Sequence, residues 1–332
     1  MEARLSESAC ASPRRPGVFV TWAPVSRRTQ TLAARLGLEQ ARVSAPWFKR
    51  PLYAPLKYPV QIARTWQLLR RVRPAEVWVM DPPAPAVLVA WAYCRLEPAT
   101  LVVDMHTVGF YDLKWRVLRL LEWPALRDAA VNLVTNRRLA DRLRSWHCRA
   151  AVLTDPLPTP PEDIDDPVEK GAVTVVATYS ADEPIHELPA VARSLSEVTM
   201  YVTGHPLVDT SRWPHNLVPT GFLDDAEYWH RLASSEVVVV LTTRPDTLLS
   251  GGYEALAVGR PVVVSGQAVL RERFGDAAVY VSDDADGIAA GIRVALAAAD
   301  DYAARSRRLA VRWEDEWQKS AAQLLRSLGG SL

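Results

Sequence analysis

Residues Val237–Ser265 read VVVVLTTRPDTLLSGGYEALAVGRPVVVS, and this stretch decides the fold. It begins with β-branched and apolar residues as far as Leu241, which predict a buried strand. A polar loop over 242–249 leads into a short helical pattern, and Pro261–Ser265 predicts a second buried strand. Strand, loop, helix and strand make a βαβ unit, whose loop lies at the carboxyl end of the first strand. Open α/β sheets bind their ligands at that edge.

The loop and the helix start carry residues suited to a phosphorylated ligand. Gly251 and Gly252 let a ligand approach the backbone closely, and the free N–H groups of a helix start attract phosphate. Glu254 can accept hydrogen bonds from two vicinal hydroxyls, and Asp246 can point into the same pocket. One anion site flanked by two carboxylates predicts a sugar–diphosphate–ribose ligand. The alternative is a helix cap at Ser250 beside a solvated Glu254.

The segment from Asp246 to Glu254, followed by ALAVGRPV, resembles the E-x7-E segment of glycosyltransferases with the GT-B fold. The resemblance implies that the first carboxylate contacts the donor sugar and the second the ribose. Asp246 stands where the family usually has the longer Glu, so its reach toward the sugar differs. The resemblance extends from about Gly17 to the C-terminus. It implies an α/β GT-B fold, with two Rossmann-like domains facing across a cleft.

Composition is that of a soluble globular protein large enough for two domains. The 332 residues are 49% hydrophobic and 23% charged, with a net charge of +1, so no strong field predicts nucleic-acid binding. Cys10, Cys94 and Cys148 form neither a metal spacing nor an even disulfide set, which suits a reducing cytoplasm. The apolar run Ala84–Cys94 is far shorter than the ~20 residues that span a bilayer.

Changes in composition divide the chain. Residues 1–16 predict a disordered tail rather than an export signal, and 17–154 an N-terminal, acceptor-binding domain. Residues 155–171, DPLPTPPEDIDDPVEKG, predict a linker because prolines alternate with acids. Residues 172–332 predict a C-terminal domain that binds the nucleotide sugar. We expect the last helix to pack back on the N-terminal domain.

Apolar segments alternate with helical patterns in both halves, which predicts two parallel sheets with crossover helices. The expected strands are Val18–Trp22, Val77–Met80, Leu101–Asp104, Val131–Thr135 and Ala151–Leu153, then Val173–Ala177, Met200–Thr203, Leu217–Pro219, Val237–Leu241, Pro261–Ser265 and Ala278–Val281.

The N-terminal half places charged residues after two of its strands. Arg27 and Arg28 can bind an anionic acceptor or can simply be solvated. Asp104 and His106 lie in DMHTVG, which resembles the D-x-H-T-G loop of GT-B transferases; the alternative is that Asp104 caps the next turn. The resemblance implies that Asp104 is the base if the reaction inverts, and that His106 contacts the donor sugar or the acceptor.

In the second half, Thr178 and Ser180 follow the first strand, where many retaining GT-B enzymes have Arg and Lys. This loop resembles that of the chitobiosyldiphosphodolichol mannosyltransferases, which invert. Without the two cations, we expect the Ser250–Gly252 amides and Arg244 to hold the diphosphate; the alternative is that Arg244 points to solvent. The other expected donor contacts are Gly204, Phe222, Thr247 and Leu248.

Aromatic and basic residues mix over residues 47–73. They predict either a surface helix or a peripheral contact with the inner membrane surface, because Trp and Tyr beside Lys and Arg suit the headgroup region. We expect a cytoplasmic protein in both cases.

These patterns predict a glycosyltransferase that moves a sugar from a nucleotide-diphosphate sugar to a hydroxyl of a glycan or lipid-linked acceptor, in polysaccharide or glycolipid biosynthesis. We expect it to need no metal and no other cofactor, since alignment and fixed dipoles can stabilise the leaving group. Two alternatives stay open: a GT-B nucleotide-sugar epimerase, and a catalytically silent protein that binds a nucleotide sugar.

Overall fold

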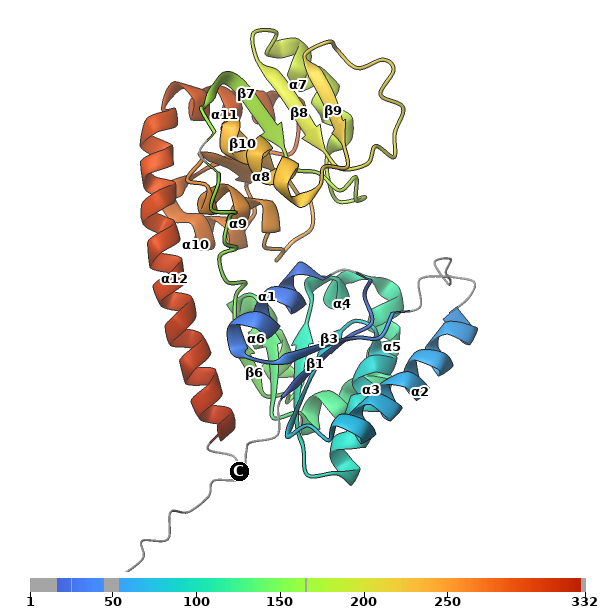
Figure 1. The fold of residues 1–332 in the computed structure, drawn as a ribbon. Helices are drawn as coiled ribbons and strands as arrows, with labels where there is room; N and C mark the ends of the chain where they lie inside the picture. Colours follow the sequence, from blue (N-terminus) through green and yellow to red (C-terminus); the bar gives the residue numbers. More distant parts are fainter. Residues whose placement is uncertain (1–16, 25, 45–53, 165, 330–332) are drawn as a thin grey trace, which may run out of the picture. The chain divides into compact units, whose positions relative to one another are not determined.

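The computed structural model describes residues 17–24, 26–44, 54–164 and 166–329. The chain forms two units, each built on its own six-stranded sheet (Figure 1). The first unit comprises the described residues as far as Val134, with Ala140–Val152 and Ser327–Gly329. The second comprises Thr135–Leu139 and Leu153–Arg326.

All strands of the first sheet are parallel, in the order β2-β1-β3-β4-β5-β6. They are β1 (Val18–Thr21), β2 (Glu39–Arg42), β3 (Glu76–Asp81), β4 (Thr100–Met105), β5 (Val131–Val134) and β6 (Ala150–Val152). Every residue of β1 and β5 is buried. Such strands are covered on both faces, which is why their sequences are continuous apolar runs rather than alternating ones.

The helices of this unit follow the strands in βαβ fashion. They are α1 (Arg27–Leu36), α2 (Ala54–Val72), α3 (Ala84–Leu96), α4 (Thr107–Tyr111), α5 (Leu113–Asp128) and α6 (Arg137–Ser145). Ser26 caps α1 by accepting from the N–H of Thr29, and Gly37 ends it with a left-handed φ of 69°. Helix α3 contacts both α2 and α5, so these three form one layer against the sheet (Figure 1).

The second sheet is also parallel, in the order β12-β11-β10-β7-β8-β9. Its strands are β7 (Glu169–Val175), β8 (Thr199–Thr203), β9 (Leu217–Gly221), β10 (Ser235–Val240), β11 (Val262–Ser265) and β12 (Ala278–Val281). Its helices are η2 (Ile185–Glu187), α7 (Leu188–Ser194), α8 (Asp225–Ser234), α9 (Ser250–Ala257), α10 (Ala268–Phe274), η3 (Gly275–Ala277), α11 (Ala285–Ala297) and α12 (Ala299–Gly329).

An aromatic cluster joins three helices of the second unit. The ring of Trp313 on α12 lies 4.6 Å from that of Tyr253 on α9 and 5.1 Å from that of Phe274 on α10, between ring centres. The Arg273 guanidinium covers the Trp313 ring at 3.7 Å. All three rings are buried. Trp313 of α12 therefore holds α9 and α10 together through Tyr253 and Phe274.

The structure departs from the expected elements in a few places. Strand β2 and helix α4 were missed, because EQAR at a sheet edge shows no apolar run and α4 is only five residues long. Strand β7 begins at Glu169, inside the predicted linker. The predicted tail 1–16 and residues 47–53 of the aromatic and basic segment lie outside the described residues.

The predicted linker packs closely against the second unit. Leu157 and Ile164 lie against its core, and Asp166 accepts a hydrogen bond from Nδ1 of His230 at 2.7 Å. Proline restricts this segment to an extended path along the surface. Separately, none of the described helices combines the length and apolarity needed to cross a bilayer.

Candidate active site

In the first unit, Arg28 and Asp104 form a buried ion pair at the carboxyl edge of the sheet. Nη2 of Arg28 lies 2.7 Å from Oδ1 of Asp104, and Nε lies 3.0 Å from Oδ2. Asp104 is fully buried near the end of β4, and Arg28 reaches it from the first turn of α1. Arg28 is therefore committed to a carboxylate of its own chain, whereas Arg27 beside it is exposed.

His106 lies against the other side of the same carboxylate. Its Nε2 is 3.3 Å from Oδ2 of Asp104, and 27% of its side chain is exposed. Burial acts to raise the pKa of Asp104, but the Arg28 guanidinium and His106 outweigh it and hold that pKa well below its usual range. A carboxylate with a low pKa is a weak base. The contact places Asp104 where it can position His106, and its expected role as the base stays a prediction.

A second buried acidic cluster, which the sequence analysis missed, lies at the same edge. Asp81 ends β3 and hydrogen-bonds Glu122 of α5, and both side chains are buried. Arg119 donates to the Gly109 carbonyl and lies over the rings of Phe110 and Trp146. Burial raises the pKa of both carboxyls, and Arg119 opposes it. Glu122 could have been suspected, because it sits on the inward face of an otherwise apolar helix pattern.

In the second unit, Gly251 and Gly252 allow close packing, and their expected contact with a ligand stays a prediction. A Cβ on Gly251 would lie 2.8 Å from Cγ1 of Val176, and one on Gly252 would lie 2.6 Å from Cζ of Phe274. Both glycines are buried, while Ser250 before them is exposed. They bring α9 close to the sheet, so backbone approach to a ligand falls to the exposed start of the helix.

That helix start lacks a side-chain cap within the described residues. The N-cap position is Leu249, which has no oxygen to accept from the first N–H groups. An uncapped helix start attracts anions through its N–H groups and dipole. The start of α9 therefore retains the phosphate-binding chemistry expected of it.

Glu254 is paired inside the unit with a partner that sequence reasoning missed. It is only 5% exposed, and its carboxylate accepts a short hydrogen bond from the Tyr228 hydroxyl of α8. The alternative of a solvated Glu254 is therefore wrong. Its contact with a ribose stays a prediction.

The loop after β7 folds on its own acid. Glu183 accepts from the N–H of Thr178 at 2.9 Å and from its hydroxyl at 2.7 Å. The Ser180 hydroxyl lies 3.0 Å from that of Thr178. Thr178 and Ser180 are exposed, so the structure brings both hydroxyls to one surface loop, where Glu183 holds that of Thr178.

Arg244 forms an ion pair with Asp182, so it does not simply point to solvent. Its Nη2 lies 2.9 Å from Oδ1 of Asp182, whose Oδ2 accepts from the Thr242 hydroxyl at 2.7 Å. The backbone N–H of Thr243 also donates to the Asp182 carbonyl at 2.7 Å. These bonds tie the loop after β10 to the loop after β7, at the carboxyl edge where the diphosphate is expected.

The remaining predicted residues lie on loops of the second unit. Gly204 has a φ of 88°, and a Cβ there would lie 2.4 Å from the Ala177 carbonyl oxygen, so only glycine fits this turn. Phe222 follows β9 and is 83% exposed. Asp246 has a φ of 55°, and Leu248 lies against the core. The Thr247 hydroxyl bonds the Pro245 carbonyl at 3.3 Å.

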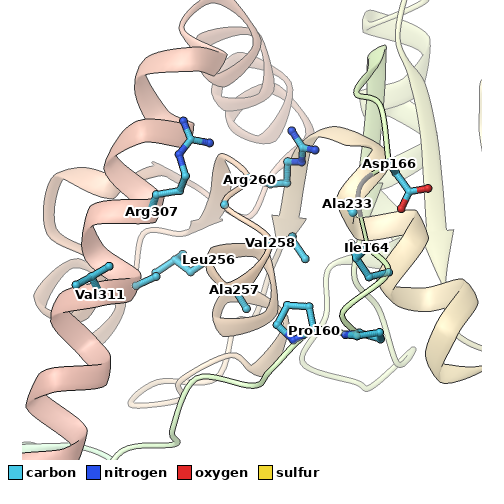
Figure 2. A pocket seen from close by; sticks show the side chains of 13 residues that line it. Pro160, Ile164, Asp166, Ala233, Leu256, Ala257, Val258, Arg260, Arg307 and Val311 are labelled. Carbon is cyan, nitrogen blue, oxygen red and sulfur yellow. The ribbon is translucent and has the colours of Figure 1, made fainter.

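One hollow of the second unit involves none of the predicted site residues (Figure 2). Its volume is about 460 Å³, and Leu256, Val258, Arg260 and Arg307 are among the side chains that line it. It lies at the far end of α9 from Ser250. Burial and the like charge of Arg307 lower the pKa of Arg260.

Metal chemistry was expected to be unnecessary. Within the residues that the structure describes, no three His, Cys, Asp or Glu side chains are grouped so as to hold a metal ion. Metal independence of the reaction stays a prediction.

Comparison with known proteins finds a similarity within the second unit. Residues 186–326 match the family described as Glycosyl transferase-like. A search of the curated proteins finds no matching sequence.

Solved structures share the whole fold. The sucrose-phosphate synthase of Thermosynechococcus elongatus is 16% identical with a TM-score of 0.73, over 96% of this chain and 100% of that one. HepE of Anabaena, in complex with UDP, is 14% identical with a TM-score of 0.69, over 95% and 100%. CalG4, the calicheamicin glycosyltransferase, is 13% identical with a TM-score of 0.55, over 96% and 100%.

The two parallel sheets with their crossover helices are therefore the GT-B fold, which confirms the expected fold class. The glycosyltransferase-like match is confined to residues 186–326, within the second unit. Neither comparison points to an epimerase or to a silent binding protein.

Proposed function

We propose that this enzyme transfers a sugar from a nucleotide-diphosphate sugar to a hydroxyl of a glycan or lipid-linked acceptor in the cytoplasm, during polysaccharide or glycolipid assembly. The observation that carries the proposal is the uncapped start of α9, one turn before the buried Glu254. An anion site beside a fixed carboxylate suits a diphosphate followed by a ribose. The free cysteines Cys94 and Cys148 support a reducing compartment.

The donor base is proposed to stack on Phe222. A largely exposed aromatic ring on a loop offers a flat apolar surface to a purine or pyrimidine. HepE has been crystallised with UDP and with UDP-glucose, so uridine nucleotides are the first donors to test. Asp246 would contact the sugar, and Thr247, Leu248 and Gly204 would line the remainder of the donor site.

Departure of the nucleoside diphosphate is proposed to depend on the α9 dipole, the hydroxyls of Thr178 and Ser180, and Arg244. Charge grows on the diphosphate as the glycosidic bond breaks, so groups that stabilise this charge act mainly on turnover. Asp182 orients Arg244 beside the loop. Arg244→Ala should therefore lower kcat more than donor affinity, whereas unchanged kcat would leave the dipole and the hydroxyls as the stabilising groups.

On the acceptor side, we propose that His106 removes the proton from the attacking hydroxyl and that Asp104 positions it. The buried carboxylate lies 3.3 Å from Nε2 of His106 and favours the imidazolium that forms. Arg28 binds Asp104, and both Arg27 and Arg28 stay the expected acceptor contacts. In Asp104→Asn, the pH–rate profile should shift while the KM for the donor stays the same; an unshifted profile would contradict the role of Asp104.

Binding of nucleotides by calorimetry tests the donor site. We expect UDP or a UDP-sugar to bind, and Glu254→Gln to weaken it by about ten- to a hundredfold, since one charged hydrogen bond contributes ~1.5–3 kcal/mol. Tyr228→Phe is a matched control, because it removes the partner of Glu254 but leaves the carboxylate. Unchanged affinity in a folded Glu254→Gln enzyme would show that Glu254 does not contact the donor. Binding of a panel of other nucleotides would identify which base the protein prefers.

A further inference from the structure

Helix α5 exposes an apolar stripe that the proposed function does not use. Leu113, Val117, Leu120 and Leu121 are 70, 61, 81 and 64% exposed. Their spacing of three and four residues places them on one face of the helix. Scattered exposed leucines are ordinary, but a contiguous row along one helix marks a surface that meets another body.

The opposite face of α5 is fixed to its own unit. Glu122, Ala125 and Leu126 are buried, and the helix contacts α3 and α4. At the end of α5, on the exposed side, Asp128 accepts a hydrogen bond from Nε1 of Trp91 of α3 at 2.9 Å. The exposed row is therefore held in place by packing on the other side.

Basic side chains flank the row. Lys114 lies on one side of it, with Arg116 and Arg127 on the other, at the helical angle of ~100° per residue; all three are exposed. Two acids lie near the row. Asp128 is engaged by Trp91 and by Arg95 at 3.4 Å, and Asp112 lies 3.6 Å from Nζ of Lys114, which stays largely exposed. Lys114 and Arg127 also lie over the rings of Trp115 and Trp123, at 4.9 and 4.7 Å. An apolar centre with basic and aromatic margins is the pattern of a helix that lies in a bilayer surface.

We propose that this face of α5 docks on an anionic lipid bilayer. The apolar row enters the boundary of the acyl chains, and the bases meet headgroup phosphates. A second copy of the chain fits the face less well, because an isologous contact would bring Lys114, Arg116 and Arg127 against their own copies.

Docking by α5 would bring the enzyme to a lipid-linked acceptor, and on this point it rests on the proposed function. Helix α5 begins seven residues after His106, and both follow β4 at the carboxyl edge of the first sheet. The start of the apolar row therefore lies on the same side of the unit as the candidate acceptor residues. The membrane contact expected of residues 47–73 stays a separate prediction.

Sedimentation with vesicles tests the proposal on the full-length protein. Vesicles of phosphatidylcholine alone are compared with vesicles containing phosphatidylglycerol. We expect binding to the anionic vesicles that weakens in 0.5 M NaCl, chosen because the Debye length is then only about 4 Å. Val117→Gln/Leu120→Gln should weaken this binding by about tenfold or more, since two inserted side chains are made polar. The matched control is Val311→Gln/Leu207→Gln, which changes two residues of similar exposure in the other unit, 67 and 72%, and should bind as the wild type does.

Three results would overturn the proposal: no binding of the wild-type protein to anionic vesicles, equal weakening by both double variants, or full binding by the α5 variant. If the wild type fails to bind but sediments as a dimer that the α5 variant disrupts, the face belongs to a second copy. Nucleotide affinity is measured without vesicles. Loss of vesicle binding with intact UDP-sugar binding contradicts this inference alone, and the reverse result contradicts the proposed donor site alone.

Discussion

At the scale of single residues, the first unit concentrates buried charge at one sheet edge. Asp104 and Arg28 compensate each other, whereas Asp81 and Glu122 share a site with Arg119 nearby. Two carboxyls that are buried together cannot both ionise without cost, so one of them retains a proton. The two clusters therefore have opposite pH behaviour, and each gives a prediction.

Removing Arg28 should leave the buried carboxylate of Asp104 without its cationic partner. We expect Arg28→Ala to lower the free energy of unfolding by about 3–5 kcal/mol at pH 7. The pKa of Asp104 is depressed in the folded protein, so the ion pair stabilises fully above the unfolded-state pKa of about 3.9 and is lost as the pH falls. Urea unfolding at pH 7 and at about pH 2 measures this. Arg28→Ala/Asp104→Asn should be more stable than Arg28→Ala, and equal stability of the two would argue against the pair.

Glu122 should behave in the opposite direction. Burial raises its pKa in the folded protein, so the bound proton stabilises the fold below the unfolded-state pKa, and this stabilisation is lost as the pH rises through the folded-state pKa. Glutamine can donate to Asp81 without needing a proton from solvent. Glu122→Gln should therefore be more stable than wild type at pH 8, by on the order of 1–3 kcal/mol, and the difference should shrink at pH 5. Thermal melting checks this, with the exposed Glu197→Gln as control; a constant difference across this range would contradict it.

At the scale of elements, α9 shows how a glycine pair can allow close packing. The sequence predicted the strand, the loop and the helix around Ser250, and the structure has all three. Sequence periodicity cannot predict which atoms pack against a glycine, because those atoms belong to residues elsewhere in the chain. Here they are Val176 and the ring of Phe274.

The close contact of Gly252 with Phe274 predicts a steric clash in a larger variant, and a smaller residue at position 274 should relieve that clash. Phe274 is held by Tyr253 and Trp313, so Gly252→Ala should overpack the core and cost about 1–3 kcal/mol. The double variant Gly252→Ala/Phe274→Leu should lose less unfolding free energy than the sum of the losses in the two single variants. Its affinity for UDP should stay near that of the wild type. Urea unfolding and calorimetry give both quantities. If the two losses of unfolding free energy are additive, or if the double variant regains stability but binds UDP weakly, Gly252 is needed for ligand binding rather than for packing.

Other elements mark the limit of sequence reasoning in the same way. Alternation of apolar strands with helical patterns was enough to predict the parallel sheets, because both faces of such strands are buried. The pairs Arg28–Asp104, Arg244–Asp182 and Tyr228–Glu254 join loops and helices far apart in sequence. Residue types nominated Arg244 and Glu254 without their partners, and they nominated Arg28 and Asp104 without the contact between them. Asp81 and Glu122 were missed for the same reason.

At the scale of the molecule, the two units have separate hydrophobic cores. Chains with separate cores often unfold in more than one step, and a ligand stabilises only the unit that holds it. The predicted donor residues, from Thr178 to Glu254, all belong to the second unit. Unfolding can therefore assign the donor site to one unit without any assumption about the reaction.

We expect two transitions in calorimetric unfolding, each sensitive to one core. Trp313→Ala should lower the transition of the second unit, because removing a buried tryptophan costs about 3–5 kcal/mol; Trp313 is 2% exposed. Leu133→Ala, in the buried strand β5, should lower that of the first. UDP at a hundred times its Kd should add about 2.7 kcal/mol to the unfolding free energy of the unit that binds it. We expect this to raise the temperature of the transition that Trp313→Ala lowers. If UDP instead raises the transition that Leu133→Ala lowers, the donor site lies in the first unit and the assignment of Glu254 and α9 fails.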